Sequence, residues 1–189
     1  MAVDRERVAS AVRELLEAIG DDPERPGLAA TPRRVAEAYD EYFSGVGVDA
    51  TIHLDSGDLA GEQTGELVLL RDIEFRSMCE HHLLPFTGIA HVAYLPGDRI
   101  VGLGRIPRVV DTIASRPQIQ ERLTDEIADA LVAGLEPRGV LVVVDAVHGC
   151  VAARGSRQAK SSTVTVASRG QLSEPIERAE IMALIGERR

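Results

Sequence analysis

The sequence predicts a mixed α+β domain, and three observations lead to this prediction. Both ends of the chain carry apolar residues at helical spacing, and the middle contains short segments rich in β-branched residues. A pair of helical patterns interrupts those segments, so the expected order is two helices, strands, two helices, two strands and a final helix. A length of 189 residues is most simply one domain.

Residues 1–48 are expected to form a helical region that belongs to the same unit as the rest of the chain. The first helix is predicted over residues 4–19, where apolar side chains recur at helical spacing: Val8, Val12, Leu15, Leu16 and Ile19. Gly20 then favours a helix end. After a connector rich in proline and glycine, Thr31-Pro32 supplies an N-cap and a first-turn proline for a second helix that ends near Gly45.

Residues 49–189 are expected to form the main part of the domain, which opens with strands. The predicted strands cover residues 51–54, 66–76 and 87–95, and Pro96-Gly97-Asp98 is a strong turn signal. Two helices are predicted next, over 107–116 and 117–135, the second with Pro117 in its first turn. Residues 139–147 are almost wholly β-branched or apolar, as in a strand buried on both faces. A further strand over 161–167 and a helix over 174–185 complete the chain.

Composition and charge limit the possible partners. With 44% hydrophobic and 27% charged residues, the chain resembles an ordinary soluble globular protein. It has no apolar run as long as a membrane span, and its first residues lack the apolar core of a signal peptide, so we expect a cytoplasmic protein without membrane contact. A formal net charge of −9 argues against nucleic acid as the main partner.

The cations are distributed unevenly. Residues 151–172 contain no acidic residue but four cations: Arg154, Arg157, Lys160 and Arg169. Such a local basic run in an acidic protein suggests a small polyanion, although solvated surface cations are an equally good interpretation. Arg34 lies in the first turn of the second predicted helix, where a cation opposes the helix dipole. It either has another role or is an exposed charge that slightly lowers the stability of the helix.

The pattern Cys79-Glu80-His81-His82 indicates a metal site. A thiol and an imidazole at C-x-x-H spacing can bind one metal from a single turn, and the only other cysteine, Cys150, follows His148 in a second cluster. Two thiolates and an imidazole suit Zn²⁺, and three protein ligands leave a fourth position for water, as in catalytic zinc sites. A disulfide between the two cysteines is the less favoured alternative.

The histidines near these cysteines can serve chemistry. If residues 148–150 are extended, the period of two points His148 and Cys150 to the same face, so that one binds the metal and the other serves the same pocket. His81 can lie beside the metal without binding it, and an imidazole there is a natural general acid or base. His53 and His91 have no such neighbours and are expected to be structural or surface residues.

At this point the chain resembles a known family, GTP cyclohydrolase I, from about residue 31 to 172. The resemblance rests on three phrases at matching intervals, which are Met78-Cys79-Glu80-His81-His82-Leu83, Arg116-Pro117-Gln118-Ile119-Gln120-Glu121-Arg122-Leu123-Thr124, and Asp145-Ala146-Val147-His148 through Cys150 with Arg154-Gly155. It implies that residues 49–189 form a catalytic domain with the tunnelling fold (T-fold), an antiparallel sheet with helices packed on one face, preceded by the N-terminal helical region. It also implies a toroidal homodecamer with active sites at subunit interfaces.

The resemblance further implies zinc-dependent hydrolysis of GTP at C8, with release of formate and rearrangement to 7,8-dihydroneopterin triphosphate, the first step of pterin and tetrahydrofolate biosynthesis. Carried over residue by residue, the zinc ligands are Cys79, His82 and Cys150, and the catalytic residues are His81 and His148. The residues expected to bind the substrate are Gln120 and Glu121 at the guanine edge, and Arg34, Arg105, Arg108 and Arg154 at the triphosphate.

Two departures from the family pattern keep alternatives open. The family usually reads Gly-Leu-Ser-Lys where this chain has Gly102-Leu103-Gly104-Arg105, and the missing serine hydroxyl is associated with the late steps of the reaction. A paralogue that stops at a ring-opened intermediate, or that takes a related purine nucleotide, is therefore an alternative. A non-catalytic ring scaffold is less favoured, because such a scaffold needs none of the retained metal ligands. Gly149 and Leu172 also replace a larger and an aromatic residue.

Overall fold

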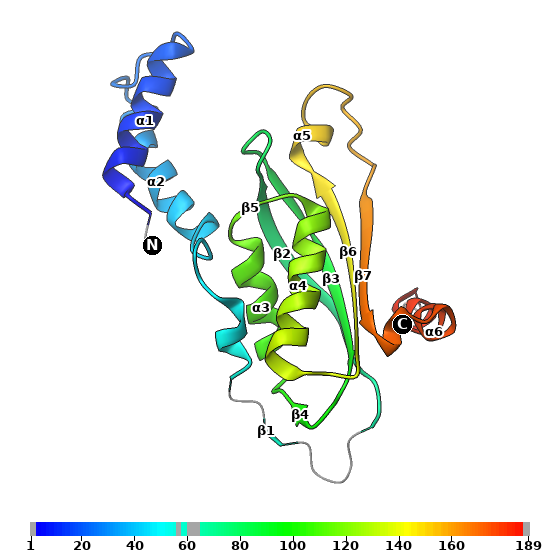
Figure 1. Ribbon diagram of the computed structural model, residues 1–189. Helices are drawn as coiled ribbons and strands as arrows, with labels where there is room; N and C mark the ends of the chain where they lie inside the picture. Colours follow the sequence, from blue (N-terminus) through cyan, green and yellow to red (C-terminus); the bar gives the residue numbers. More distant parts are fainter. Residues whose placement is uncertain (1–2, 56–57, 60–64, 187–189) are drawn as a thin grey trace.

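The computed structural model describes residues 3–55, 58–59 and 65–186. Its centre is a five-stranded sheet in the order β5-β2-β3-β6-β7 (Figure 1). The strands are β2 (Val68–Cys79), β3 (Pro85–Leu95), β5 (Pro117–Gln118), β6 (Gly139–His148) and β7 (Thr163–Gly170). All neighbours are antiparallel except β5, which runs parallel to β2. A separate small ladder joins β1 (Asp58–Leu59) to β4 (Arg99–Ile100).

Two helices cover one face of the sheet, as predicted. These are α3 (Arg105–Ala114) and α4 (Gln120–Leu135), and they lie side by side over the strands (Figure 1). Alternate residues of β6, such as Val142 and Val144, pack into the core beneath them. The intervening residues, such as Leu141 and Val143, belong to a second cluster on the other face. The prediction that this strand is buried on both faces is therefore confirmed.

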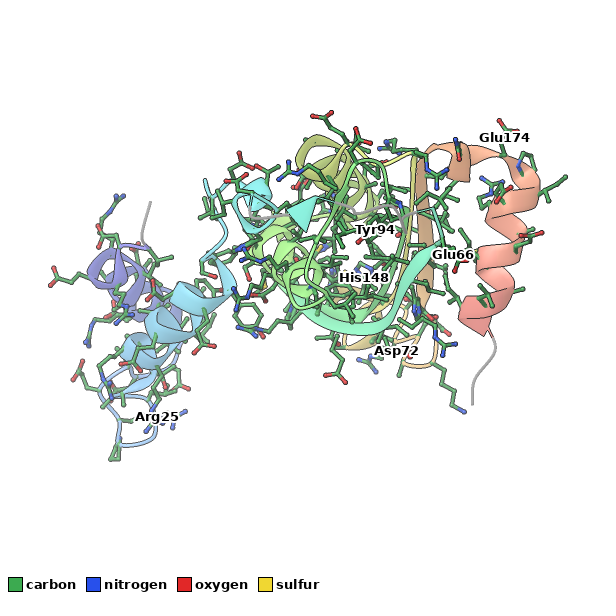
Figure 2. All side chains as sticks on the ribbon, turned by 90° about the horizontal axis from the view of Figure 1, so that it is seen from below. Arg25, Glu66, Asp72, Tyr94, His148 and Glu174 are labelled. Carbon is green, nitrogen blue, oxygen red and sulfur yellow. The ribbon has the colours of Figure 1, made fainter. Side chains whose placement is uncertain are left out.

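The second cluster is closed by the end of the chain. The short η2 (Gln171–Ser173) buries Leu172, and α6 (Pro175–Gly186) buries Ile181 against the same cluster. In Figure 2 the helix α6 and the N-terminal helices lie on opposite sides of the sheet. The final helix is thus confirmed, and it covers part of the face that α3 and α4 leave open.

The N-terminal helices form a pair that projects from the sheet (Figure 1). They are α1 (Arg5–Ala18), with Asp4 accepting a hydrogen bond from Arg7 N as its cap, and α2 (Thr31–Tyr42). The pair is connected to the rest of the molecule by backbone contacts around Gly45, whose N–H donates to Ser115 O at 2.9 Å. A Cβ on Gly45 would lie 1.9 Å from Thr112 O, so only glycine fits there. The boundary at residue 48 stays a prediction.

Two predicted elements are wrong. Residues 51–54 were expected to be extended, but Ala50–His53 form the 3₁₀ helix η1, because the Asp49 carboxylate accepts from Thr51 N at 3.0 Å and caps a turn. The helix predicted from Pro117 begins instead at Gln120. Arg116 precedes a proline and Ile119 is extended (φ −112°, ψ 148°), so the chain pairs with β2 before the helix begins.

No helix in the described part of the chain combines the length and the apolar character that a membrane crossing requires.

His91 is a structural residue, as one of the two interpretations expected. It lies on β3 with 5% of its surface exposed, and its Nδ1 accepts a hydrogen bond from Asp72 N at 3.2 Å. Asp72 has a left-handed backbone (φ 59°) where the β2–β3 register shifts. Burial lowers the pKa of His91, with a smaller lowering effect from Arg71, while Asp72 and Asp145 oppose the change.

This pKa shift predicts a pH-dependent stability. Because the pKa of His91 is lower in the folded state, the unfolded chain binds the proton more readily, so stability is complete above the ordinary value and is lost as pH falls towards the folded one. We expect His91→Gln, whose amide oxygen can accept from Asp72, to lose less unfolding free energy than the native chain as pH falls through this range. Urea unfolding across a pH series measures this, and parallel curves would contradict it.

Candidate active site and metal centre

The first half of the candidate metal site is the turn between β2 and β3. Cys79 ends β2 and is 5% exposed, and its N–H donates to Leu84 O at 2.9 Å. Leu83 N donates back to Cys79 O at 2.8 Å and Leu83 has a left-handed backbone (φ 48°), which closes the turn. His82 is exposed within this turn. The C-x-x-H spacing therefore lies on a tight hairpin connection, as its pattern predicted.

The second half of the candidate metal site follows β6, and here the condition of an extended backbone over residues 148–150 is not met. His148 ends the strand, but Cys150 lies in a short helix, α5 (Gly149–Ala152), because the chain turns at Gly149 and Ala153 N donates to Gly149 O at 3.0 Å. A Cβ on Gly149 would lie 2.7 Å from Pro85 O, so glycine lets the chain pass close to β3. The turn, and not a shared strand face, brings Cys150 towards Cys79.

The three predicted ligands meet. The Sγ atoms of Cys79 and Cys150 and a ring nitrogen of His82 all lie within 4.8 Å of one another. Burial raises the pKa of the Cys150 thiol, and Cys79 raises it further, whereas Arg154 acts in the opposite direction. Two thiols this close are poorly stabilised as anions by the protein alone, and a bound cation would supply the missing charge. The donor set fits a metal of the zinc type.

Two histidines flank this cluster in different surroundings. The His81 ring is exposed and nearly perpendicular to the His82 ring, with centroids 6.4 Å apart. His148, labelled in Figure 2, is half-buried and stacks on Phe86 at 4.7 Å with an interplanar angle of 8°. Burial lowers the pKa of His148, and the nearby Glu121 carboxylate opposes this. His148 and Glu121 therefore share the end of the sheet at which the metal ligands meet.

The predicted phosphate-binding arginines are not brought together within one chain. Arg154 lies near Cys150, as its effect on that thiol indicates. Arg105 and Arg108 lie in the first turn of α3, at the end of the sheet remote from α5 (Figure 1). The Arg105 guanidinium donates to His53 O at 3.2 Å. Arg34 is exposed on α2, in the projecting helical pair.

One cation of the basic run has another partner. Arg169 forms ion pairs with Asp125 at 2.8 Å and Asp129 at 2.9 Å on α4, so it ties β7 to that helix. These carboxylates hold the pKa of Arg169 above its usual value. Of the four cations in residues 151–172, those that could bind a polyanion are therefore Arg154, Arg157 and Lys160, which are all exposed.

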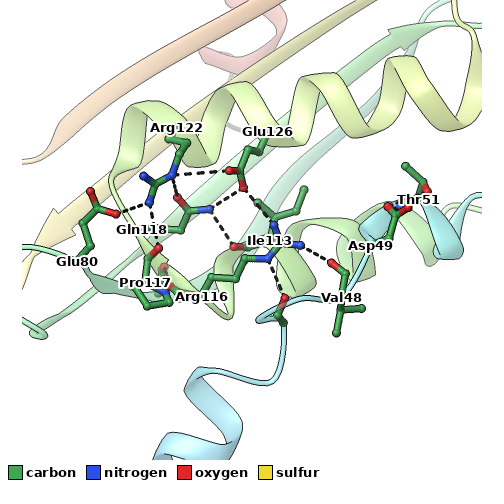
Figure 3. A network of polar contacts seen from close by, with 12 residues as sticks. Val48, Asp49, Thr51, Glu80, Ile113, Arg116, Pro117, Gln118, Arg122 and Glu126 are labelled. Atoms are coloured by element: carbon green, nitrogen blue, oxygen red, sulfur yellow. Dashed lines mark hydrogen bonds and ion pairs between the residues drawn. The ribbon is translucent and has the colours of Figure 1, made fainter. Parts of the chain in front are cut away.

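A polar network that the sequence did not predict supports the turn carrying Cys79 and His82 (Figure 3). Arg122 on α4 pairs with Glu80 of the turn, and its Nε donates to Gln118 Oε1 at 2.9 Å. Gln118 Nε2 donates in turn to Glu126 at 2.8 Å, and Glu126 pairs with Arg116 at 3.3 Å. Only the i,i+4 pair Arg122–Glu126 on α4 has a signal in the sequence that could have revealed part of it.

Two thiols and an imidazole that meet at one end of the sheet, beside a further, half-buried imidazole, are an arrangement that fits a metal-dependent hydrolase. Comparison with known families gives the particular one. The model of the family described as GTP cyclohydrolase I matches residues 8–186. The chain belongs to the GTP cyclohydrolase I family, and the antiparallel sheet with α3 and α4 on one face is its tunnelling fold.

Curated relatives agree with this assignment. GTP cyclohydrolase 1 of Leifsonia xyli subsp. xyli is 60% identical over 183 residues, covering 97% of this chain and 96% of the relative. GTP cyclohydrolase 1 of Clostridioides difficile is 53% identical over 185 residues, covering 97% of each. Among solved structures, the archaeosine synthase QueF-Like in the apo form aligns with a TM-score of 0.48 and 19% identity, covering 57% of this chain and 97% of that one.

The network around Arg122 predicts an effect on metal affinity. Arg122→Met removes the ion pair that holds Glu80, so the turn carrying Cys79 and His82 loses part of its preorganisation. We expect zinc affinity to fall by about tenfold, the lower end of what supporting hydrogen bonds contribute. Competition with a chromophoric chelator measures this. Arg169→Met, which breaks ion pairs of the same helix without touching the turn, is the control, and equal losses in both variants would contradict the prediction.

Proposed function

We propose that this protein hydrolyses GTP at C8 in a zinc-dependent reaction, releases formate and rearranges the product to 7,8-dihydroneopterin triphosphate. The observation that carries this proposal is the convergence of Cys79, His82 and Cys150 in a chain of the GTP cyclohydrolase I family. We further propose that this reaction is the first step of pterin and tetrahydrofolate biosynthesis and that the protein is cytoplasmic.

Cys79, His82 and Cys150 would hold the zinc ion, and their three donors leave one tetrahedral position open. Bound there, zinc would supply Lewis-acid activation of the water that attacks the purine. The chain itself contributes acid–base groups. His148 would move protons during ring opening, formate release and the ribose rearrangement, and exposed His81 would protonate the opening ring at nitrogen. Glu121 would accept from the ring N–H and the exocyclic amine of guanine.

The arginines would bind the triphosphate from more than one subunit. Arg154 lies on the side of the metal ligands, whereas Arg105 and Arg108 lie at the other end of the sheet and Arg34 on the projecting pair. A flexible side chain does not span the length of β3, which is roughly 30 Å for its strand geometry. We therefore propose a homo-oligomer, a decamer, in which neighbouring chains complete each site.

The direct test is turnover of GTP by the purified, zinc-loaded protein. We expect a fluorescent pterin after oxidation of the product, and we expect removal of zinc with a chelator to abolish the reaction. Formate or an opened purine without pterin would support the ring-opened alternative, and the absence of turnover would support a scaffold.

The variant Gly104→Ser tests whether the protein completes the reaction to the pterin or stops at a ring-opened intermediate. Gly104 is the N-cap of α3 without a side-chain hydrogen bond, and a Cβ there would have open space around it in the described part of the chain, so serine fits. If the native protein and the variant form pterin at similar rates, the missing hydroxyl does not limit the late steps of the reaction.

Sharing of sites between subunits can be tested by mixing two defects. Cys150→Ser removes a metal ligand and Arg108→Ala removes a phosphate contact, so each variant alone is expected to be inactive. When both chains are co-expressed at equal levels, about one quarter of the interfaces combine an intact metal side with an intact Arg108, and activity should return to about that fraction. Gel filtration checks that both variants assemble. Continued inactivity in a normally assembled mixture would contradict shared sites.

A further inference from the structure

Gln120 is a buried polar residue in the active-site region. It is the first residue of α4, only 2% exposed, and its side chain reaches between β6 and β7. The Nε2 atom donates to Val144 O at 3.0 Å and to Thr163 O at 2.7 Å, and it lies 3.2 Å from Thr165 Oγ1. On the other side, Oε1 lies 2.7 Å from Nε2 of His148. The amide therefore joins the catalytic imidazole to the backbone of two strands.

The surroundings permit only one orientation of this amide. Turning it over would place its oxygen against the two main-chain carbonyl oxygens of Val144 and Thr163, so that acceptors would face acceptors. The amide oxygen must therefore face His148. Since that oxygen can only accept a hydrogen bond, the His148 Nε2 atom carries the proton and donates it.

Two threonines complete the assignment. Thr124 donates its single hydroxyl proton to Gln120 O at 2.7 Å. The contact of 2.6 Å between the Thr124 and Thr165 hydroxyls must then use the proton of Thr165, so neither hydroxyl has a proton left for the Gln120 amide, whose own two protons go to Val144 O and Thr163 O. Each hydroxyl and amide proton in this group has one defined direction, so the network cannot reverse to suit the other tautomer of His148.

We propose that Gln120 is a positioning residue that fixes His148 in the tautomer with its proton on Nε2, so that Nδ1 is the nitrogen that takes part in the reaction. Phe86, stacked on the ring at 4.7 Å, fixes the plane in which this nitrogen lies. This inference rests on the proposed function of His148. It also changes the expected role of Gln120, whose side chain the sequence resemblance assigned to the guanine edge.

Kinetics of a matched pair of variants separate the possible roles of Gln120. Gln120→Met keeps the volume but removes the acceptor for His148, and we expect kcat to fall by roughly a hundredfold, as for a displaced acid–base group, with KM for GTP within about threefold of the native value. Thr165→Val, the control, removes the hydroxyl beside the same amide and its contact with Thr124, so it should lower the melting temperature with little change in kcat. A raised KM with kcat retained would assign Gln120 to base recognition, and unchanged kinetics would leave a structural role; either overturns the proposal.

A spectroscopic readout is independent of turnover. Solid-state NMR of the zinc-loaded native protein with ¹⁵N-labelled histidine reports which ring nitrogen is protonated, and comparison with His148→Asn identifies the His148 signals among the five histidines. We expect a protonated Nε2 and a bare Nδ1 in the native protein, with both tautomers populated in Gln120→Met. A proton on Nδ1 of native His148 overturns the proposal. Failure of GTP turnover would instead contradict the proposed function and leave this tautomer intact.

Discussion

The register between β3 and β6 is the constraint on which the site depends. Phe86 lies opposite His148, and nine further pairs continue this register to Leu95 and Gly139. Side chains alternate between the faces of a strand. A slip by one residue would therefore turn His148 away from Phe86 and onto the face opposite its hydrogen-bond partner Gln120. The same slip would displace α5, and Cys150 could not reach Cys79. In this register Val140, Val142 and Val144 enter the core beneath α3 and α4, and Leu141 and Val143 enter the cluster on the other face.

Most of the fold could be predicted because its signals are local. The N-terminal helices, the long strands and the apolar stripe of α4 follow from periodicity that packing then reinforces. The errors occur where a local polar contact or a steric restriction outweighs propensity. Asp49 caps a turn in residues that resemble a strand, and the bond before Pro117 delays the start of α4. Neither effect has a periodic pattern from which it could be predicted.

The candidate site shows the same division. The cluster of Cys79, His82 and Cys150 could be predicted from C-x-x-H spacing and a single remaining cysteine, although the helical turn at Gly149 that brings Cys150 into place could not. The Arg122 network and the orientation of Gln120 depend on contacts between residues that are distant in sequence, such as Gln120 with Thr163. A single sequence contains no record of such pairs, and only the three-dimensional structure shows them.

The joint at Gly45 has a mechanical consequence. Arg116 donates to Gly45 O at 2.9 Å and to Val48 O at 2.6 Å, so the guanidinium that anchors the projecting helices is the one that pairs with Glu126. From Glu126 the chain of contacts continues through Gln118 and Arg122 to the turn that carries His82 (Figure 3). One continuous set of hydrogen bonds and ion pairs therefore connects the projecting helices to the turn that carries His82. A displacement of these helices would be transmitted through those contacts to that turn.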